Sequence, residues 1–350
     1  MRRAPFRPLL ALLLALPAWW AGAQELEPGG ERHDGYVRYL IGDPAAPTPG
    51  KVSPGLLLLG GGDRNHGALR WFLDHAGHGH LVVLSASYGR QIADEFDHDA
   101  GGVASAQTLV FGDRKAAYDP AVLAALAHAD AIFIAGGDQA RYVRLWKDTP
   151  LAQALDAHVR AGKPLGGTSA GLAMLGQYLY GALDGGSQTS GPALADPLGP
   201  ANTLVTGFLH LDLLAGIITD THFSERQRLG RLVAFLAKAE SIAGHPLTGL
   251  GVDEAAALAV EGDGSARVYA TDPRRGAIVV RGGLAPQQPG RPMRLARLQT
   301  VGVGVGSRLQ LPQATVERPA FERAYRVEDG VLLPLDPPRQ AAAGGYHPVH

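Results

Sequence analysis

Five short apolar segments in this chain of 350 residues each run into a glycine-rich or polar turn. The segments are Gly55–Leu59, Leu81–Ala86, Thr108–Phe111, Ala131–Ala135 and Pro164-Leu165. Such strands, alternating with helices predicted at Asp119–His128 and Leu151–Ala161, are typical of an α/β fold with a mostly parallel sheet that is covered on both faces. Ligands bind beyond the carboxyl ends of the strands in such sheets, so we expect the loops to gather along one edge and form a site there.

The N-terminus has the layout of a secretory signal peptide. Basic residues come first, an apolar run over 9–20 follows, and Ala21-Gly22-Ala23 gives a small-residue cleavage site. We predict cleavage after Ala23 and export to the periplasm or the extracellular space. The apolar run is shorter than the roughly 20 residues that span a bilayer, which disfavours a retained anchor. No second long apolar segment follows, so we expect no membrane partner after cleavage.

The composition is that of a globular protein, with 46% hydrophobic residues, 19% charged residues and a net charge of −1. There is no overall basic field, which argues against a nucleic-acid partner. Cysteine is absent, which excludes disulfides, thiolate metal sites and cysteine nucleophiles together.

We predict four parts in the chain: a signal peptide over 1–23, an N-terminal arm over 24–54, a main α/β domain over 55–264 and a β-rich extension over 265–350. The arm is polar and rich in Pro and Gly, with one strand expected at Tyr36–Ile41. Short alternating segments separated by Pro and Gly indicate strands in the extension. The low-complexity run at 301–306 is interpreted as a flexible crossing.

The segment Gly167-Thr168-Ser169-Ala170-Gly171 is a G-x-S-x-G pentapeptide between a short strand and a run suited to a buried helix. In a nucleophile elbow, the serine projects from a strained strand-to-helix turn. The N–H of Ala170 would then form part of an oxyanion hole, and the loop at Gly137 could supply the second donor. Glycine is abundant here, so the pentapeptide alone does not distinguish an elbow from a simple turn.

A serine hydroxyl needs a base, usually a histidine that a carboxylate orients. The candidate base is His222, in a loop after the strand-like segment that ends at Thr219. Ser224 and Gln227 fit a capping box for a helix that follows. The alternative is a structural loop histidine.

Three arginines follow the histidine: Arg226, Arg228 and Arg231. Close to a helix N-terminus they would attract an anion, although a solvated helix face would look the same. The orienting carboxylate is either Asp184 or Glu254, and periodicity does not choose between them. The histidines at 75, 78 and 80 are better explained as a polar loop than as a metal site, so no metal is predicted.

Four segments in this order resemble the cyanophycinase and aspartyl dipeptidase family of serine peptidases, and the cyanophycinase branch most closely. They are IAGGDQ (134–139), GGTSAG (166–171), DTHFSERQRLGRL (220–232) and GVDE (251–254). The resemblance covers roughly residues 50–262 and makes the main domain the catalytic peptidase domain.

The resemblance implies a three-layer α/β/α fold similar to class I glutamine amidotransferases. It implies Ser169 as the nucleophile, His222 as the base and Asp184 as the orienting carboxylate, with Gly137 and Ala170 at the oxyanion. It also implies a set of substrate-binding residues: Asp138, Gln139, Arg226, Arg228, Arg231 and Glu254. No cofactor or metal is implied, and the family suggests a homodimer.

Cyanophycin, the implied substrate, has a polyaspartate backbone that carries arginine on each β-carboxyl, and its hydrolysis releases β-Asp-Arg dipeptides. Cyanophycinases typically carry Gln directly before the histidine, where this chain has Thr221. The departure bears on substrate specificity and leaves the serine chemistry intact. Aspartyl or isoaspartyl dipeptidase activity stays open, as do an α/β-hydrolase esterase and a catalytically silent amidotransferase-like binding module.

Overall fold

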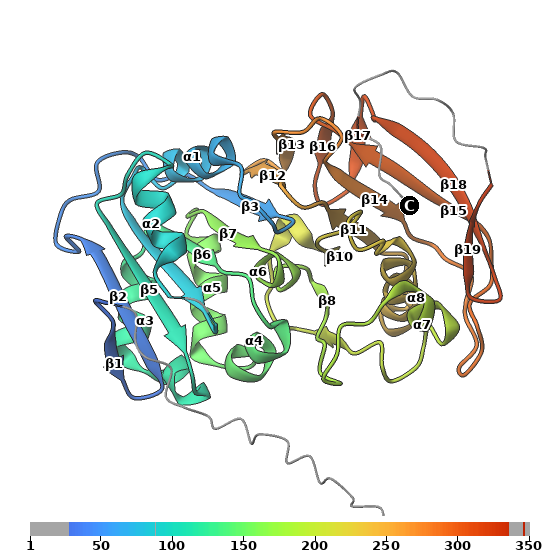
Figure 1. The fold of residues 1–350 in the computed structure, drawn as a ribbon, viewed down its shortest axis with the longest axis horizontal. Coiled ribbons are helices and arrows are strands. Elements are labelled where there is room, and N and C mark those ends of the chain that lie inside the picture. The colour runs from blue at the N-terminus through green and yellow to red at the C-terminus, as the bar shows by residue number, and fades with distance from the viewer. Residues whose placement is uncertain (1–27, 88, 336–345, 347–350) are drawn as a thin grey trace, which may run out of the picture.

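The computed structural model of the chain describes residues 28–87, 89–335 and 346. The predicted signal peptide lies outside the described residues. Within the described ranges, no helix is long and apolar enough to cross a membrane. Two mixed β-sheets form the framework, with eleven strands in one and eight in the other (Figure 1).

The larger sheet has five adjacent parallel strands at its centre, in the order β5-β4-β6-β7-β3. Their bounds are Ser105–Phe111 (β5), His80–Ser85 (β4), Ala131–Ile134 (β6), Leu165–Thr168 (β7) and Gly55–Leu59 (β3). Every residue of β3 is buried because the sheet is covered on both faces. Leu57 and Leu59 pack into one apolar cluster, and Leu56 and Leu58 into another. The predicted buried parallel sheet is therefore confirmed in this central part.

Helices lie on both faces of the larger sheet (Figure 1). Helices α1 (His66–His75) and α2 (Gln91–His98) cover one face, where their apolar side chains pack against Phe133 of β6. Helices α3 (Pro120–His128), α4 (Gln139–Trp146) and α5 (Pro150–Arg160) supply residues to the cluster on the other face. Both α3 and α5 begin with proline after a side-chain cap, from Asp119 and Thr149.

The smaller sheet has the order β19-β18-β15-β14-β11-β10-β8-β9. Its parallel neighbours are β8 with β10 and β10 with β11, and its other neighbouring strands are antiparallel. The bounds are Tyr178–Tyr180 (β8), Leu204–Thr206 (β9), Ile217–Asp220 (β10), Thr248–Val252 (β11), Ala277–Arg281 (β14), Leu295–Val303 (β15), Phe321–Glu328 (β18) and Val331–Pro334 (β19). Helices α7 (Ser190–Ala195) and α8 (Leu229–Ala243) pack on this sheet and share its apolar cluster.

The remaining strands flank the five parallel strands of the larger sheet, and the remaining helices and 3₁₀ turns are short. They are β1 (Glu31–His33), β2 (Tyr36–Gly42), α6 (Ala170–Ala173), β12 (Ala256–Glu261), β13 (Ser265–Ala270), β16 (Arg308–Gln310), β17 (Thr315–Glu317) and the 3₁₀ turns at Arg114–Tyr118 and Asp212–Leu214. The strand expected in the N-terminal arm is present as β2, which pairs with β5 along its whole length. This stretch of the arm is thus an integral part of the larger sheet.

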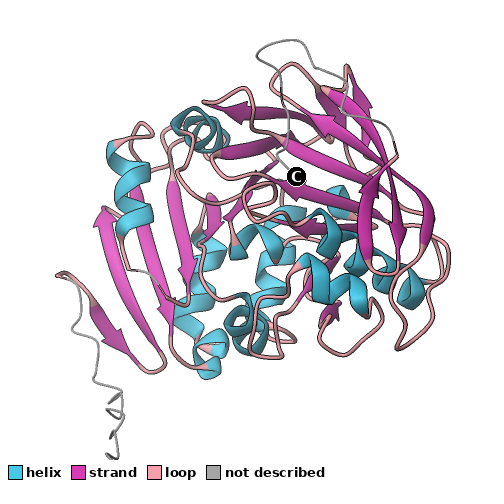
Figure 2. Cartoon of the chain, turned by 45° about the vertical axis from the view of Figure 1, so that its right-hand side comes forward, coloured by secondary structure: helices cyan, strands magenta, loops and turns pink. Residues whose placement is uncertain are grey.

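The extension from residue 265 is β-rich, as predicted, and Figure 2 shows strands dominating that part of the molecule. It continues both sheets, because β13 pairs with β12 in the larger sheet and β14 pairs with β11 in the smaller one. The predicted single, mostly parallel sheet is therefore too simple. The flexible crossing expected at 301–306 is also wrong in its first half, since Val301–Val303 complete β15 and are buried there.

Candidate active site

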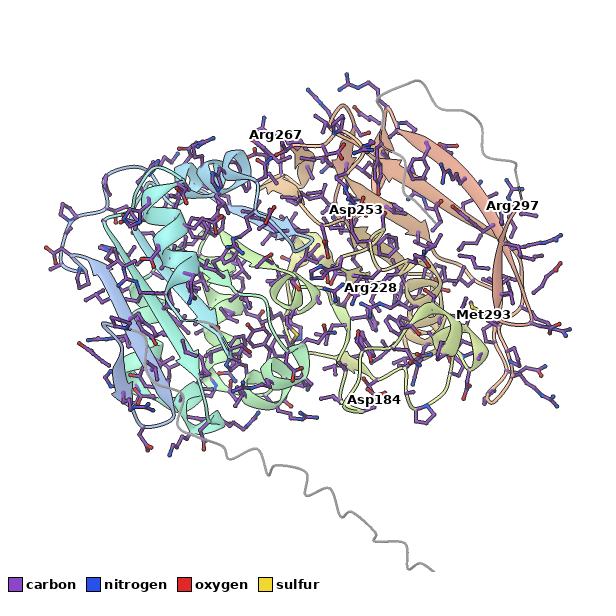
Figure 3. All side chains as sticks on the ribbon, viewed as in Figure 1. Asp184, Arg228, Asp253, Arg267, Met293 and Arg297 are labelled. Carbon is purple, nitrogen blue, oxygen red and sulfur yellow. The ribbon has the colours of Figure 1, made fainter. Side chains whose placement is uncertain are left out.

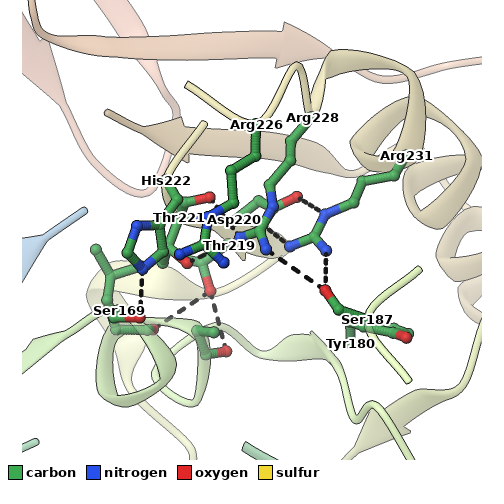
Figure 4. Close-up of polar contacts among 12 residues, drawn as sticks. Ser169, Tyr180, Ser187, Thr219, Asp220, Thr221, His222, Arg226, Arg228 and Arg231 are labelled. Carbon is green, nitrogen blue, oxygen red and sulfur yellow. Dashed lines mark hydrogen bonds and ion pairs between the residues drawn. The ribbon is translucent and has the colours of Figure 1, made fainter. Parts of the chain in front are cut away.

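Three strand ends bring Ser169, His222 and Glu254 together. Ser169 follows β7 of the larger sheet, whereas His222 and Glu254 follow the parallel neighbours β10 and β11 of the smaller sheet. Ser169 Oγ lies 2.6 Å from His222 Nε2 (Figure 4). His222 Nδ1 lies 2.5 Å from Glu254 Oε1. With the proton on Nδ1 donated to the carboxylate, Nε2 is free to accept the serine proton.

The backbone at Ser169 has the geometry of an elbow. Its φ of 53° and ψ of −119° are unusual for a residue with a side chain. Helix α6 starts at the next residue and packs tightly, because a Cβ on Gly171 would lie 2.1 Å from the carbonyl oxygen of Ile134. A Cβ on Gly167 would lie 2.6 Å from the backbone of Gly171. The pentapeptide therefore needs its glycines for backbone contact, and this close packing exposes the serine at the strand end.

The loop after β3 ties the three candidate residues to one another through the backbone. Each of three successive carbonyls accepts an N–H from a candidate residue or its neighbour: Leu59 O from Ser169 (3.0 Å), Gly60 O from His222 (2.8 Å) and Gly61 O from Ala255 (2.9 Å). The sequence predicted only a tight turn here. The turn in fact links the end of the larger sheet to both loops of the smaller one.

The prediction that Asp184 contacts His222 is wrong, because Glu254 lies at Nδ1 instead. Asp184 is exposed on the loop that follows β8. Figure 3 shows it well apart from Asp253, the residue before Glu254. The reason is strand pairing: β10 and β11 are parallel partners in register from Ile217↔Thr248 to Asp220↔Gly251, so the residues that follow them meet.

The segment after His222 is a series of turns, and α8 starts only at Leu229. The predicted capping box of Ser224 and Gln227 does not form. The N–H of Ser224 is donated to the buried carboxylate of Asp253 (3.0 Å), and the N–H of Gln227 returns to Ser224 O (3.1 Å). The carboxylate of Asp253, from a distant part of the chain, thus accepts the Ser224 N–H that the side chain of Gln227 would accept in a capping box.

Arg231 does not line the pocket as predicted but is buried in an ion pair. Its guanidinium contacts both carboxylate oxygens of Asp220, and the Nε contact measures 2.8 Å. Figure 4 shows this ion pair between Arg231 and Asp220. The guanidinium of Arg231 also lies over the rings of Tyr180 and Phe235. Removing one partner of such a buried pair typically costs about 3–5 kcal/mol, so Arg231 is committed to the fold.

Arg228 and Arg226 do line a pocket of about 340 Å³ above Ser169. Arg228 is 7% exposed and donates to Thr221 O at 2.7 Å. Burial lowers the pKa of Arg228 to about 10, which leaves it charged at neutral pH. Arg226 is half exposed, with its Nε 3.9 Å from Glu254 Oε1.

The strip after β6 forms the other wall of the pocket, as predicted for Gly137, Asp138 and Gln139. Asp138 accepts the N–H of Ala140 and caps α4, and Gln139 Nε2 donates to Tyr180 O. A Cβ on Gly136 would lie 3.4 Å from Ser169 Cβ, so this strip runs directly beside the serine.

Ala170 also lines the pocket, and its N–H belongs to the first turn of α6, where N–H groups have no partner within the helix. Among the lining residues that sequence reasoning missed, two carry polar side chains: Arg144 of α4 and Ser187 of the loop after β8. No local motif marks either of them. Glu254 is predicted as a substrate-binding residue, but its carboxylate contacts His222 and Arg226 of this chain instead.

The pKa of His222 lies below its usual value of 6.5, chiefly because burial disfavours the imidazolium. The hydrogen bond that His222 donates to Glu254 opposes this shift, whereas the charges of Arg226 and Arg228 reinforce it. The imidazole is therefore mainly neutral at neutral pH, which is the state a proton acceptor requires.

The histidines at 75, 78 and 80 make separate contacts. His75 Nε2 pairs with Glu261 (2.9 Å), His78 Nδ1 with Gly102 O (2.8 Å), and His80 Nδ1 with Ser105 Oγ (2.8 Å). Among the described residues, no group of three or more His, Cys, Asp or Glu side chains is arranged to hold a metal ion.

Comparison with known proteins gives consistent relatives. The family model of peptidase family S51 matches residues 113–268, which include Ser169, His222 and Glu254. A cyanophycinase of Trichormus variabilis is 32% identical over 231 residues, or 62% of this chain and 71% of that protein. A cyanophycinase of Synechococcus elongatus is 35% identical over 204 residues, and the match spans 57% of each protein. The chain thus covers little more than half the length of that relative.

Among solved structures, a peptidase from an acI-B1 Actinobacterium aligns with 75% of this chain and 98% of its own, with a TM-score of 0.51 and 18% identity. At that level of identity the match supports a shared fold alone.

Substituting Gly61 by alanine should disturb the site. A Cβ there would lie 2.3 Å from His222 Cε1, and the residue has a φ of +108°. We expect the added methyl to displace the imidazole of His222. The Gly61→Ala variant should then react with an uncharged fluorophosphonate about 10²-fold more slowly at Ser169, since a shift of about 1 Å in a reacting group can cost that much in rate.

Gly162→Ala is the matched control, because Gly162 also has positive φ (+75°) but no atom within 4 Å of the added methyl. It should lose stability through backbone strain and keep its labelling rate. Equal labelling rates in the two variants would contradict the role given to Gly61.

Proposed function

The chain belongs to peptidase family S51, and from this membership together with the contacts of Ser169 we propose that it is an exported serine peptidase of the cyanophycinase type. The observation that carries the proposal is the hydrogen-bonded chain Ser169–His222–Glu254 at the base of an arginine-lined pocket. The proposed reaction is hydrolysis of an aspartyl peptide bond through an acyl-enzyme.

In the proposed first step, Ser169 Oγ attacks the carbonyl carbon while His222 Nε2 takes the hydroxyl proton. Glu254 holds the Nδ1–H and stabilises the imidazolium that forms. His222 then gives the proton to the leaving amine, which departs as the acyl-enzyme forms. In the second half, His222 takes a proton from water, which attacks the ester carbonyl; His222 then gives the proton to Ser169 Oγ as the bond to the acyl group breaks and the acid leaves.

The negative oxygen of each tetrahedral intermediate needs donors that are fixed in advance. We assign this role to the backbone N–H groups of Ala170 and Gly137, two residues that line the same pocket as Ser169. Removal of one such donor typically costs about 10²–10³ in kcat. Backbone donors suit the task because they do not reorganise during the reaction.

The charges of the pocket favour an acidic substrate. Its lining carries Arg144, Arg226 and Arg228 against the single carboxylate of Asp138, which already caps α4. Arginine pairs with carboxylates in a charge-assisted and often bidentate manner. We assign Arg226 and Arg228 to the substrate's carboxylates, with Gln139 as a further polar contact. This charge balance favours an aspartyl peptide over the short ester of an α/β-hydrolase.

Two finer parts of the proposal come from the sequence. Export rests on the predicted signal peptide over 1–23. The relation to class I glutamine amidotransferases rests on the family resemblance, and the helices on both faces of the parallel strands support it.

The proposal is tested by incubating the purified chain with cyanophycin and determining the masses of the products. We expect β-Asp-Arg dipeptides from the wild-type chain and none from Ser169→Ala, with both proteins equally folded. Cleavage of Asp-X dipeptides alone, with the polymer intact, would replace the cyanophycinase assignment by the dipeptidase one. Full activity of Ser169→Ala would refute the mechanism.

Glu254 and Asp184 are distinguished by paired amide substitutions. Glu254→Gln should lower kcat on the order of 10⁴-fold, because an amide can present the wrong hydrogen-bonding group to His222 Nδ1. Asp184→Asn should leave kcat near the wild-type value, since Asp184 is exposed away from the histidine. Steady-state kinetics on the same substrate decides, and the reverse ranking would return the orienting role to Asp184.

The pH dependence of kcat/KM should follow the depressed pKa of His222. Activity requires the neutral imidazole, so it falls as the pH drops through that pKa, and the midpoint of the acid limb should lie below 6.5. Arg226→Gln removes a positive charge that lowers this pKa, so the midpoint should move up. A wild-type midpoint above 6.5, or a downward shift in the variant, would contradict the account.

A further inference from the structure

The two loops that carry His222 and Glu254 hold each other through exchanged backbone contacts. Asp253 Oδ1 accepts the N–H of Ser224 at 3.0 Å. In return, Glu225 Oε2 accepts the N–H of Glu254 at 3.1 Å. Each loop therefore supplies a carboxylate to the other loop's backbone, directly beside the two residues assigned to catalysis.

The turn between β13 and β14 contacts the carboxylates of both Glu225 and Asp253. Arg275 forms an ion pair with Glu225, whose side chain is 17% exposed. The next residue, Gly276, donates its N–H to Asp253 Oδ2 at 3.2 Å and accepts the N–H of Asp253 through its own carbonyl at 3.0 Å. Through Arg275 and Glu225 the β-rich extension thus lies two contacts away from Glu254, which in turn contacts the candidate base His222.

We propose that Glu225 is a positioning residue for Glu254, and that Arg275 of the extension holds Glu225 in place. In the part of the chain that the structure describes, Glu225 makes no hydrogen bond or ion pair with Ser169 or His222 and does not line the pocket, so its action runs through the backbone of Glu254. A carboxylate that accepts a backbone N–H fixes where that residue's side chain begins. The short contact between Glu254 and His222 Nδ1 depends on that position.

This inference rests on the proposed serine chemistry, and it gives the extension a part in that chemistry. Partners that orient a directly acting group typically contribute about 10–100-fold to activity, as with outer-shell ligands of metal sites. Loss of Glu225 should therefore reduce turnover more than substrate binding, because Glu225 does not line the pocket and Arg228 keeps its own hydrogen bond to Thr221 O.

The test compares three variants in the full chain. Glu225→Ala removes the acceptor for the N–H of Glu254, whereas Glu225→Gln keeps an amide oxygen in the same place. We expect Glu225→Ala to lower kcat about tenfold or more with KM nearly unchanged, and Glu225→Gln to recover most of that loss. Arg275→Gln, which removes the ion pair and keeps the acceptor, should lie between wild type and Glu225→Ala.

Glu240→Ala is the matched control. Glu240 also accepts backbone N–H groups from neighbouring segments, at Leu247 (2.9 Å) and Gly283 (2.7 Å), but it lies near the far end of α8. It should lower the melting temperature and leave kcat per folded molecule unchanged. Active-site titration with a fluorophosphonate normalises each kcat to the competent fraction, so partial unfolding is not counted as lost catalysis.

The inference is overturned if Glu225→Ala keeps wild-type kcat, if its loss appears in KM alone, or if Glu225→Gln fails to recover turnover. Should Glu225→Ala not fold, Arg275→Gln and Glu225→Gln decide by the same comparison. An inactive wild type that also fails to label at Ser169 would instead refute the proposed function, so the two failures are distinguishable.

Discussion

Three successive carbonyls at the end of β3 hold the candidate site together. The oxygens of Leu59, Gly60 and Gly61 accept the N–H groups of Ser169, His222 and Ala255. Buried backbone N–H and C=O groups must be paired, so each of these hydrogen bonds fixes the position of the loop that donates the N–H. Side chains are excluded here, because a Cβ on Gly60 would lie 1.9 Å from the carbonyl oxygen of Asp253. One short segment thus connects the loop that follows β7 of the larger sheet to the loops that follow β10 and β11 of the smaller sheet.

The part of the fold that could be predicted is the part that repeats a local pattern. Buried apolar strands followed by glycine-rich or polar turns identified the central parallel strands, the edge with the site and the loop of Ser169. The orienting carboxylate depends on which strands pair, and the pairing of β10 with β11 brings together residues 32 positions apart. Asp184 is nearer than Glu254 to Ser169 in sequence, but Glu254 is the carboxylate at His222, so the residue that the family resemblance implied is wrong. The two-sheet arrangement is likewise a matter of strand pairing, which short strands do not encode individually.

The arginines after His222 illustrate the same limit. In sequence they look alike, but Arg231 lies against both carboxylate oxygens of the buried Asp220 and does not line the pocket, whereas Arg228, 3.6 Å from the same carboxylate, and Arg226 do line it. The positive charge at the pocket therefore depends on how each guanidinium group is placed in the fold, which only tertiary structure determines. That balance also lowers the pKa of His222, so the groups assigned to the substrate help to keep the base neutral.

The account stands on Ser169 being a nucleophile that His222 activates. Peptide mapping by mass spectrometry after treatment with a fluorophosphonate tests this most directly. The account predicts one adduct, on Ser169, that forms rapidly in the folded wild-type chain and is absent from a folded His222→Ala variant within the same time. An adduct on another serine, or equal labelling of Ser169 without His222, would contradict it.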